Sequence, residues 1–137
     1  MLTELSVENF ALVEKLRLTF GPGLNLLTGE TGAGKSILLD ALGMALGERT
    51  GGDAIRHGAE KARVEAVFTV DENDSRLREA MEAAGVEAED GILLLGRELT
   101  ASGKSTVRIN GRPATVGMLK RTVLGSTYAK VHKVFAR

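Results

Sequence analysis

Apolar and polar residues alternate along the first 20 positions of the chain. Leu2–Phe10 alternates for most of its length, and a second alternating stretch follows at 13–20. A period of two is typical of strands that bury one face. Gly21-Pro22-Gly23 then predicts a turn, and the largely apolar segment 24–28 predicts a short buried strand. Together these segments favour an antiparallel hairpin beside a parallel strand of the core.

Two helices are predicted. The first covers residues 36–46 and follows a glycine-rich segment. The second begins after Asp74 or Ser75, either of which can cap it, and Gly85 can end it. Three apolar residues share one side of this second helix: Leu77, Met81 and Ala84.

Further strands are predicted at 63–70, at 92–95 together with 97–99, and at 106–109, where apolar residues are close together or alternate with polar ones. Asn110-Gly111 follows the last of these strands and is a strong tight-turn dipeptide. The chain therefore combines helices with a sheet that has antiparallel parts, an α/β arrangement.

The segment Gly29-Glu30-Thr31-Gly32-Ala33-Gly34-Lys35-Ser36 matches the pattern G-x-x-x-x-G-K-[ST] at every fixed position. It lies between a predicted strand and a predicted helix, which is the context of a phosphate-binding loop. Glycines there allow successive backbone N–H groups to point at one anion. Lys35 would reach the β- and γ-phosphates, and the Ser36 hydroxyl would hold Mg²⁺. The sequence therefore predicts a nucleoside triphosphate site.

Two other stretches imitate parts of such a site. Gly103-Lys104-Ser105 has Glu98 where the motif needs its first glycine, so we predict a basic loop between strands. The run 66–71 resembles the apolar strand and aspartate that hold Mg²⁺ in P-loop enzymes. Thr69 interrupts that run and Asp71 opens a polar turn, which favours a structural role.

Several parts of a hydrolytic site are missing from the sequence. No convincing second acidic motif follows the P-loop, there is no Leu-Ser-Gly-Gly-type signature, and the chain contains no glutamine. Residues for binding are present, while those for hydrolysis are largely absent. The sequence therefore contains the binding half of a nucleotide-hydrolysing site.

Composition limits the class of protein. The 137 residues, 43% of them hydrophobic, provide for one domain. There is no cysteine for a disulfide, two separated histidines make a zinc site improbable, and no apolar run is long enough for a membrane helix. We therefore expect a cytoplasmic protein without a membrane partner.

Charge is unevenly distributed although the formal net charge is zero. Residues 1–98 carry 10 basic and all 18 acidic side chains, whereas residues 99–137 carry 8 basic and no acidic ones. Such asymmetry is typical of a segment that faces nucleic acid, and equally of a tail that pairs with the acidic part of its own chain.

The sequence resembles the start of the RecN family of bacterial DNA-repair proteins, SMC-like members of the ABC ATPase superfamily. The resemblance rests on Leu5–Glu14, on the run from Phe20 through Ser36, on Asp40-Ala41-Leu42, and on the stretches 55–62 and 109–113. It covers residues 1–120, whereas residues 121–137 form a divergent basic tail of uncertain status.

The resemblance implies the N-terminal lobe of a P-loop ATPase head with an antiparallel β subdomain. In that family a coiled coil and a C-terminal lobe, which holds the hydrolysis motifs, belong to the same protein. Two heads form a homodimer with ATP and Mg²⁺ between them, and the complete protein acts on DNA double-strand breaks in the cytoplasm at the nucleoid. An isolated lobe would bind ATP without efficient turnover.

The resemblance also indicates which residues contact the nucleotide. Lys35 is the expected catalytic residue and Ser36 the expected metal ligand. Ile37 would lie close to the α-phosphate, and Lys61 and Arg63 belong to a stretch near the adenine in related heads. The expected nucleotide-binding residues are Gly29, Glu30, Thr31, Gly32, Ala33, Gly34, Lys35, Ser36, Ile37, Lys61 and Arg63.

Two alternatives remain open. One is a self-contained small P-loop kinase, which would need arginines around its phosphoryl acceptor. Arg76, Arg78 and Arg97 are poor candidates, because the first two share a polar helix face with acidic residues. The other is a DNA-binding module whose P-loop has no catalytic role.

Overall fold

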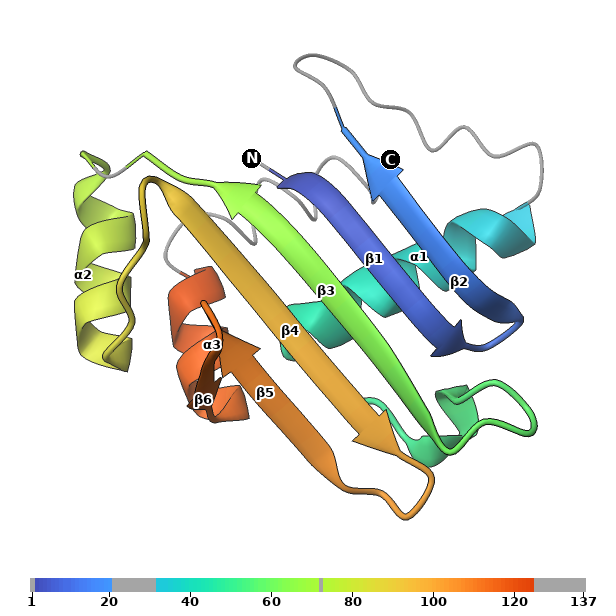
Figure 1. Ribbon diagram of the computed structural model, residues 1–137. Coiled ribbons are helices and arrows are strands. Elements are labelled where there is room, and N and C mark those ends of the chain that lie inside the picture. The colour runs from blue at the N-terminus through green and yellow to red at the C-terminus, as the bar shows by residue number, and fades with distance from the viewer. Residues whose placement is uncertain (1, 21–31, 72, 125–137) are drawn as a thin grey trace.

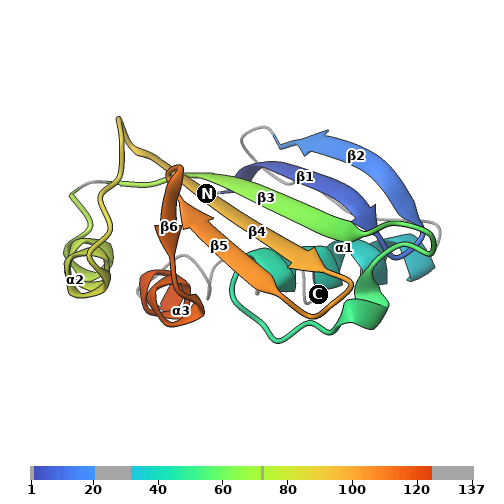
Figure 2. The ribbon, with the colours of Figure 1, turned by 60° about the horizontal axis from the view of Figure 1, so that its bottom comes forward.

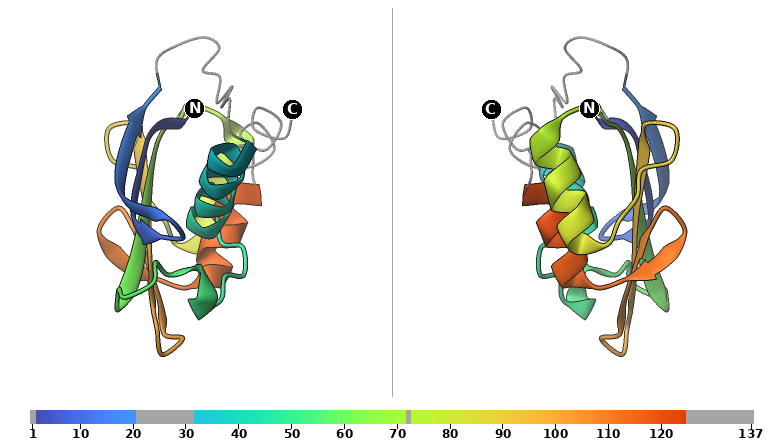
Figure 3. Two further views of the ribbon diagram at one scale, coloured as in Figure 1. Left: turned by 90° about the vertical axis from the view of Figure 1, so that its right-hand side faces the viewer. Right: turned by 90° about the vertical axis from the view of Figure 1, so that its left-hand side faces the viewer.

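The computed structural model describes residues 2–20, 32–71 and 73–124. The described strands form one six-stranded sheet in the order β2-β1-β3-β4-β5-β6, and every pair of neighbours is antiparallel. Figure 1 shows the sheet in front of the helices. The side views in Figure 3 show two layers, with the described helices on one face of the sheet. The opposite face, called the open face below, is not covered by any of these helices.

The predicted N-terminal hairpin is confirmed. β1 (Leu2–Phe10) and β2 (Val13–Thr19) pair antiparallel, and β1 pairs on its other side with β3 (Lys61–Thr69). Burial alternates along β3, so this strand has one face in the core and one open face. The predicted parallel strand at 24–28 lies outside the described residues.

The centre of the sheet agrees with the prediction except at one glycine. β4 (Ile92–Thr100) is continuous through Gly96, the residue that the predicted strand at 92–95 with 97–99 left out. Gly96 lies in the middle of β4 and is paired with β3 on one side and with β5 on the other. These two ladders fix the glycine in the strand, which overrides its weak preference for extended structure.

The predicted tight turn joins β5 (Ser105–Ile109) to β6 (Arg112–Ala114), a strand that the sequence did not predict. Asn110 and Gly111 have φ values of 51° and 79°, as a type I′ turn requires. The Asn110 side chain accepts a hydrogen bond from the Leu94 backbone N–H at 2.7 Å and donates one to the Glu87 carbonyl at 2.7 Å. The turn is thereby tied to β4 and to the segment that precedes it.

The helix layer consists of α1 (Gly32–Ala45), α2 (Ser75–Ala84) and α3 (Val116–Leu124), with a short 3₁₀ turn at Gly52–Ala54. α1 packs on β1, β3 and β4, whereas α2 packs on α3 at the far end of the sheet, as Figure 2 shows. The core between the layers is apolar; its largest fully buried side chains include Phe68, Leu5, Met44, Leu93 and Leu95.

α2 confirms its sequence prediction closely. The Asp74 side chain accepts hydrogen bonds from the backbone N–H groups of Arg76 and Leu77, and Gly85 ends the helix with φ 73°. α3 was not predicted. The helix continues past residue 120. The predicted boundary between the head lobe (1–120) and the basic tail (121–137) therefore falls within α3, and it stays a prediction.

Candidate nucleotide site

The phosphate-binding motif runs into α1. Gly29, Glu30 and Thr31 lie outside the described residues, and the helix begins at Gly32, four residues before the predicted start. Its first turn contains no acidic side chain. The first N–H groups of a helix have no partner within it, and the helix dipole favours an anion there. This end of α1 therefore fits a phosphate group.

α1 is apolar on nearly all sides. Residues 41–46 are buried, and α1 packs on β1, β3 and β4. Ile37, the residue expected near the α-phosphate, is half-buried, as are Leu38 and Leu39. A helix with this pattern requires cover on more than one side. The first half of α1 thus presents apolar surface that the described part of the chain covers incompletely.

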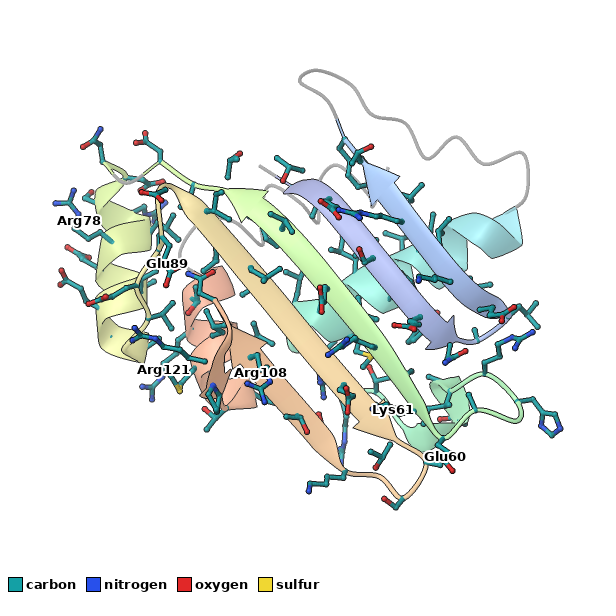
Figure 4. The ribbon with its side chains drawn as sticks, in the orientation of Figure 1. Glu60, Lys61, Arg78, Glu89, Arg108 and Arg121 are labelled. Carbon is teal, nitrogen blue, oxygen red and sulfur yellow. The ribbon has the colours of Figure 1, made fainter. Side chains whose placement is uncertain are left out.

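Lys61 and Arg63 lie on the open face of β3, the side of the sheet away from α1. Lys61 Nζ is 3.7 Å from a carboxylate oxygen of Glu98, and Arg63 Nε is 3.8 Å from Glu98 and 3.6 Å from Glu65. Figure 4 shows Lys61 at the start of β3. The structure pairs these two cations with carboxylates on the face opposite α1, and their contact with the nucleotide stays a prediction.

The two segments that imitate parts of a nucleotide site, 103–105 and 66–71, lie in or run into turns of the sheet. Gly103 and Lys104 lie in the exposed turn between β4 and β5, as predicted for a loop. Asp71 follows β3 and its Oδ1 accepts a hydrogen bond from the Asn73 N–H at 2.9 Å, so it opens a turn as predicted. Within the described ranges, no three Asp, Glu, His or Cys side chains gather into a potential metal site.

Arg97 has a role that the sequence did not indicate. It is buried on the core face of β4, where its guanidinium donates hydrogen bonds to the Met44 carbonyl in the last turn of α1 and to the Glu48 carbonyl just after the helix. Arg76 belongs to α2, as does Arg78, whereas Arg97 is bound to α1. The available signal was the alternation Leu93, Leu95, Arg97, Leu99, which places the arginine on the apolar face of its strand.

The basic C-terminal third is only partly described, since residues 125–137 lie outside the described residues. Arg108 points from the open face of the sheet, whereas Arg121 belongs to α3 in the helix layer (Figure 4). The described positive charges are therefore spread over both layers.

No described helix has the length and apolar character needed to cross a bilayer.

A groove among the described residues lies away from α1, beside α2. It has a volume of about 410 Å³ and mixed walls: its apolar lining includes Val70, Leu77 and Met81, and its charged lining includes Asp71 and Arg78. No residue of the phosphate-binding motif lines it. The candidate nucleotide site is thus defined by the start of α1 and not by this groove.

Comparisons with known proteins agree on one family. The family described as AAA domain matches residues 4–112. A DNA repair protein RecN from Halalkalibacterium halodurans is 42% identical over 132 residues, which is 96% of this chain and 23% of that protein. RecN from Bacillus subtilis is 38% identical over 96% of this chain and 22% of its own length. The chain thus spans less than a quarter of these relatives.

Solved structures share the fold. A structure from work on ATP-driven dimerization and DNA-stimulated activation of SMC ATPases has a TM-score of 0.72 and 21% identity, covering 90% of this chain and 78% of that one. An Smc head bound to the C-winged helix domain of ScpA has a TM-score of 0.70, 22% identity, and coverage of 90% and 40%. The fold is that of an SMC-type ATPase head lobe.

Proposed function

Because the chain belongs to the AAA domain family, we propose that it is the ATP-binding N-terminal lobe of an SMC-like ATPase head that acts in the repair of DNA double-strand breaks. One observation carries the proposal: a complete phosphate-binding motif leads into a helix that packs on the centre of an SMC-type sheet. The RecN relatives support the repair role.

Each residue of the motif has a defined task in this proposal. Backbone N–H groups of Gly29–Ser36 surround the phosphates, and the Lys35 ammonium neutralises the β- and γ-phosphates. The Ser36 hydroxyl holds Mg²⁺, which supplies charge stabilisation at the phosphates when bound. Lys61 and Arg63 serve the adenine end of the nucleotide. This assignment rests on the family resemblance, since both side chains lie on the sheet face opposite α1 and form ion pairs with Glu98 there.

The chain provides one side of a shared site. It lacks an evident acidic motif and signature motif, and it covers 23% of the relative from H. halodurans. The partly exposed Ile37, Leu38 and Leu39 on α1 support a second lobe of the same protein packing against this helix. Hydrolysis then requires that lobe, a coiled coil that connects it, and a homodimer of heads with ATP between them.

The proposed protein works on DNA in the cytoplasm at the nucleoid. The neighbouring SMC and RecF structures support a head that closes around nucleotide. The buried position of Arg97 weakens the kinase alternative, since this arginine is bound to α1 and is not free to contact a phosphoryl acceptor.

Calorimetric titration of ATP into the chain, with and without Mg²⁺, tests the binding function. We expect saturable binding that weakens when Mg²⁺ is removed, because the metal offsets repulsion among the phosphate charges. No binding under either condition would contradict the proposal. Salt-dependent DNA binding that ignores ATP and persists after Lys35→Ala would favour the non-catalytic DNA-binding module.

A further inference from the structure

Arg97 is a buried cation in the middle of the sheet. The residue is only 6% exposed and lies on the face of β4 toward α1, between Leu95 and Leu99. Burial lowers the pKa of its guanidinium from the ordinary value. Among the described residues no carboxylate forms an ion pair with it. A buried charge without such a partner must be stabilised in another way.

The stabilising partners are one backbone carbonyl in the last turn of α1 and one in the segment that directly follows it. Arg97 Nη1 donates to the carbonyl oxygen of Met44 at 3.1 Å and also to that of Glu48. Its Nε donates to Ser105 Oγ on the neighbouring strand at 3.1 Å. One side chain therefore joins two strands of the sheet to a helix that lies about 50 residues earlier in the sequence.

This end of α1 is a closed helix terminus. Gly47 has φ 101°, its N–H donates to the Met44 carbonyl at 3.2 Å, and the Glu48 N–H donates to the Gly43 carbonyl at 2.9 Å. These two bonds form a Schellman motif. α1 has no basic residue in its own last turn, so Arg97 supplies the positive charge that the helix dipole favours there.

The hydrogen bonds of Arg97 restrain α1 along its own axis, a direction in which its apolar contacts restrain it less. Apolar packing is non-directional and holds the sides of the helix against the sheet. The directed bonds to the Met44 carbonyl, in the last turn of the helix, and to the Glu48 carbonyl, just beyond it, also oppose sliding along the helix axis. α1 has 14 residues, so its phosphate-binding end lies about 20 Å from this anchor along one continuous helix.

We propose that Arg97 is a positioning residue for nucleotide binding: it anchors the end of α1 to the sheet and thereby sets the place of the phosphate-binding loop at the other end. This inference rests on the proposed function, in which Gly29–Ser36 binds ATP. A helix that shifts by about 1 Å would misplace several N–H donors at once and weaken contacts with the phosphates.

Nucleotide binding by two variants of Arg97 tests the inference. We expect Arg97→Met, which keeps bulk without charge, to raise the Kd for Mg²⁺-ATP about 10-fold. Arg97→Lys keeps the charge with fewer hydrogen bonds and should raise it roughly threefold. Arg108→Met is the matched control on the neighbouring strand, because Arg108 lies on the open face and its guanidinium donates a local hydrogen bond to the Gly111 carbonyl; the Kd of this variant should equal that of wild type.

Thermal unfolding without nucleotide is measured in parallel, and binding is measured well below every unfolding midpoint. A residue that only stabilises the fold would lower the midpoint and leave the Kd within about twofold of wild type, and that result would overturn the inference. Should Arg97→Met not fold, an unchanged Kd for Arg97→Lys would overturn it equally. Wild-type chain that binds no ATP would instead refute the proposed function, and the inference with it.

Discussion

Replacing Lys35 with alanine should weaken ATP binding by about 100-fold or more, because hydrogen bonds between charged groups contribute about 1.5–3 kcal/mol each and this ammonium is proposed to serve two phosphates. The lost contacts are those with the β- and γ-phosphates of the nucleotide. ADP, which lacks the γ-phosphate, should lose less affinity than ATP. Calorimetric titration of both nucleotides into wild type and variant measures the difference.

Lys104 offers the matched control for this prediction. It stands in the same Gly-Lys-Ser tripeptide as Lys35 but lies in the exposed turn between β4 and β5. Lys104→Ala should therefore bind ATP as wild type does. Equal losses at Lys35 and Lys104 would show that ATP binds through general positive charge, and the phosphate-binding assignment would fail.

Replacing Phe68 with alanine destabilises the fold by about 4 kcal/mol, because it leaves a cavity in the core. Phe68 is fully buried in β3, where it lies opposite Leu93 of β4 and Leu2 of β1. Such a loss is a large part of the roughly 5–15 kcal/mol by which domains are stable. Urea unfolding followed by circular dichroism measures it as a lower midpoint.

Val67→Ala serves as the control on the same strand. Val67 is half-buried and faces the open side of the sheet, opposite Leu94. Its truncation should cost about 1 kcal/mol. Similar losses at positions 67 and 68 would contradict the assignment of the α1 side of the sheet as the principal core.

Local signals in the sequence predicted those elements that local interactions determine. α2 has an N-cap at Asp74, apolar residues at helical spacing, and Gly85 at its end, and each of these signals lies within the helix or next to it in the chain. The turn at Asn110-Gly111 is equally local, since both residues must adopt positive φ. Alternation predicted the hairpin of β1 and β2 for the same reason.

Elements that depend on neighbours in space were missed. Gly96 was left out of the strand predicted at 92–95 with 97–99, whereas pairing on both sides holds it in β4. β6 contains Pro113 and is short, and it forms only through pairing with β5. α3 was missed for another reason. Thr115 precedes this helix, and its Oγ1 accepts a hydrogen bond from the Met118 N–H at 3.1 Å. This capping residue was a local signal that the prediction did not use.

The residues of the candidate site also differ in whether local sequence could predict them. The phosphate-binding motif follows a fixed local pattern, so its residues could be named from the sequence. The anchor formed by Arg97 joins residues 49 and 53 positions apart, and no local pattern encodes that contact. Lys61 and Arg63 were assigned by resemblance, and their ion pairs with Glu98 depend on strand register.

Steady-state ATP hydrolysis by two proteins tests the central claim, that this chain is the binding half of a shared ATPase site. One protein is the chain itself. The other is a chimera in which the chain replaces the matching segment of the H. halodurans relative, with Lys35→Ala of each as control. We expect ATP binding without turnover by the chain, and turnover by the chimera that Lys35→Ala abolishes. Steady hydrolysis, or phosphoryl transfer to an acceptor, by the chain alone would contradict the account.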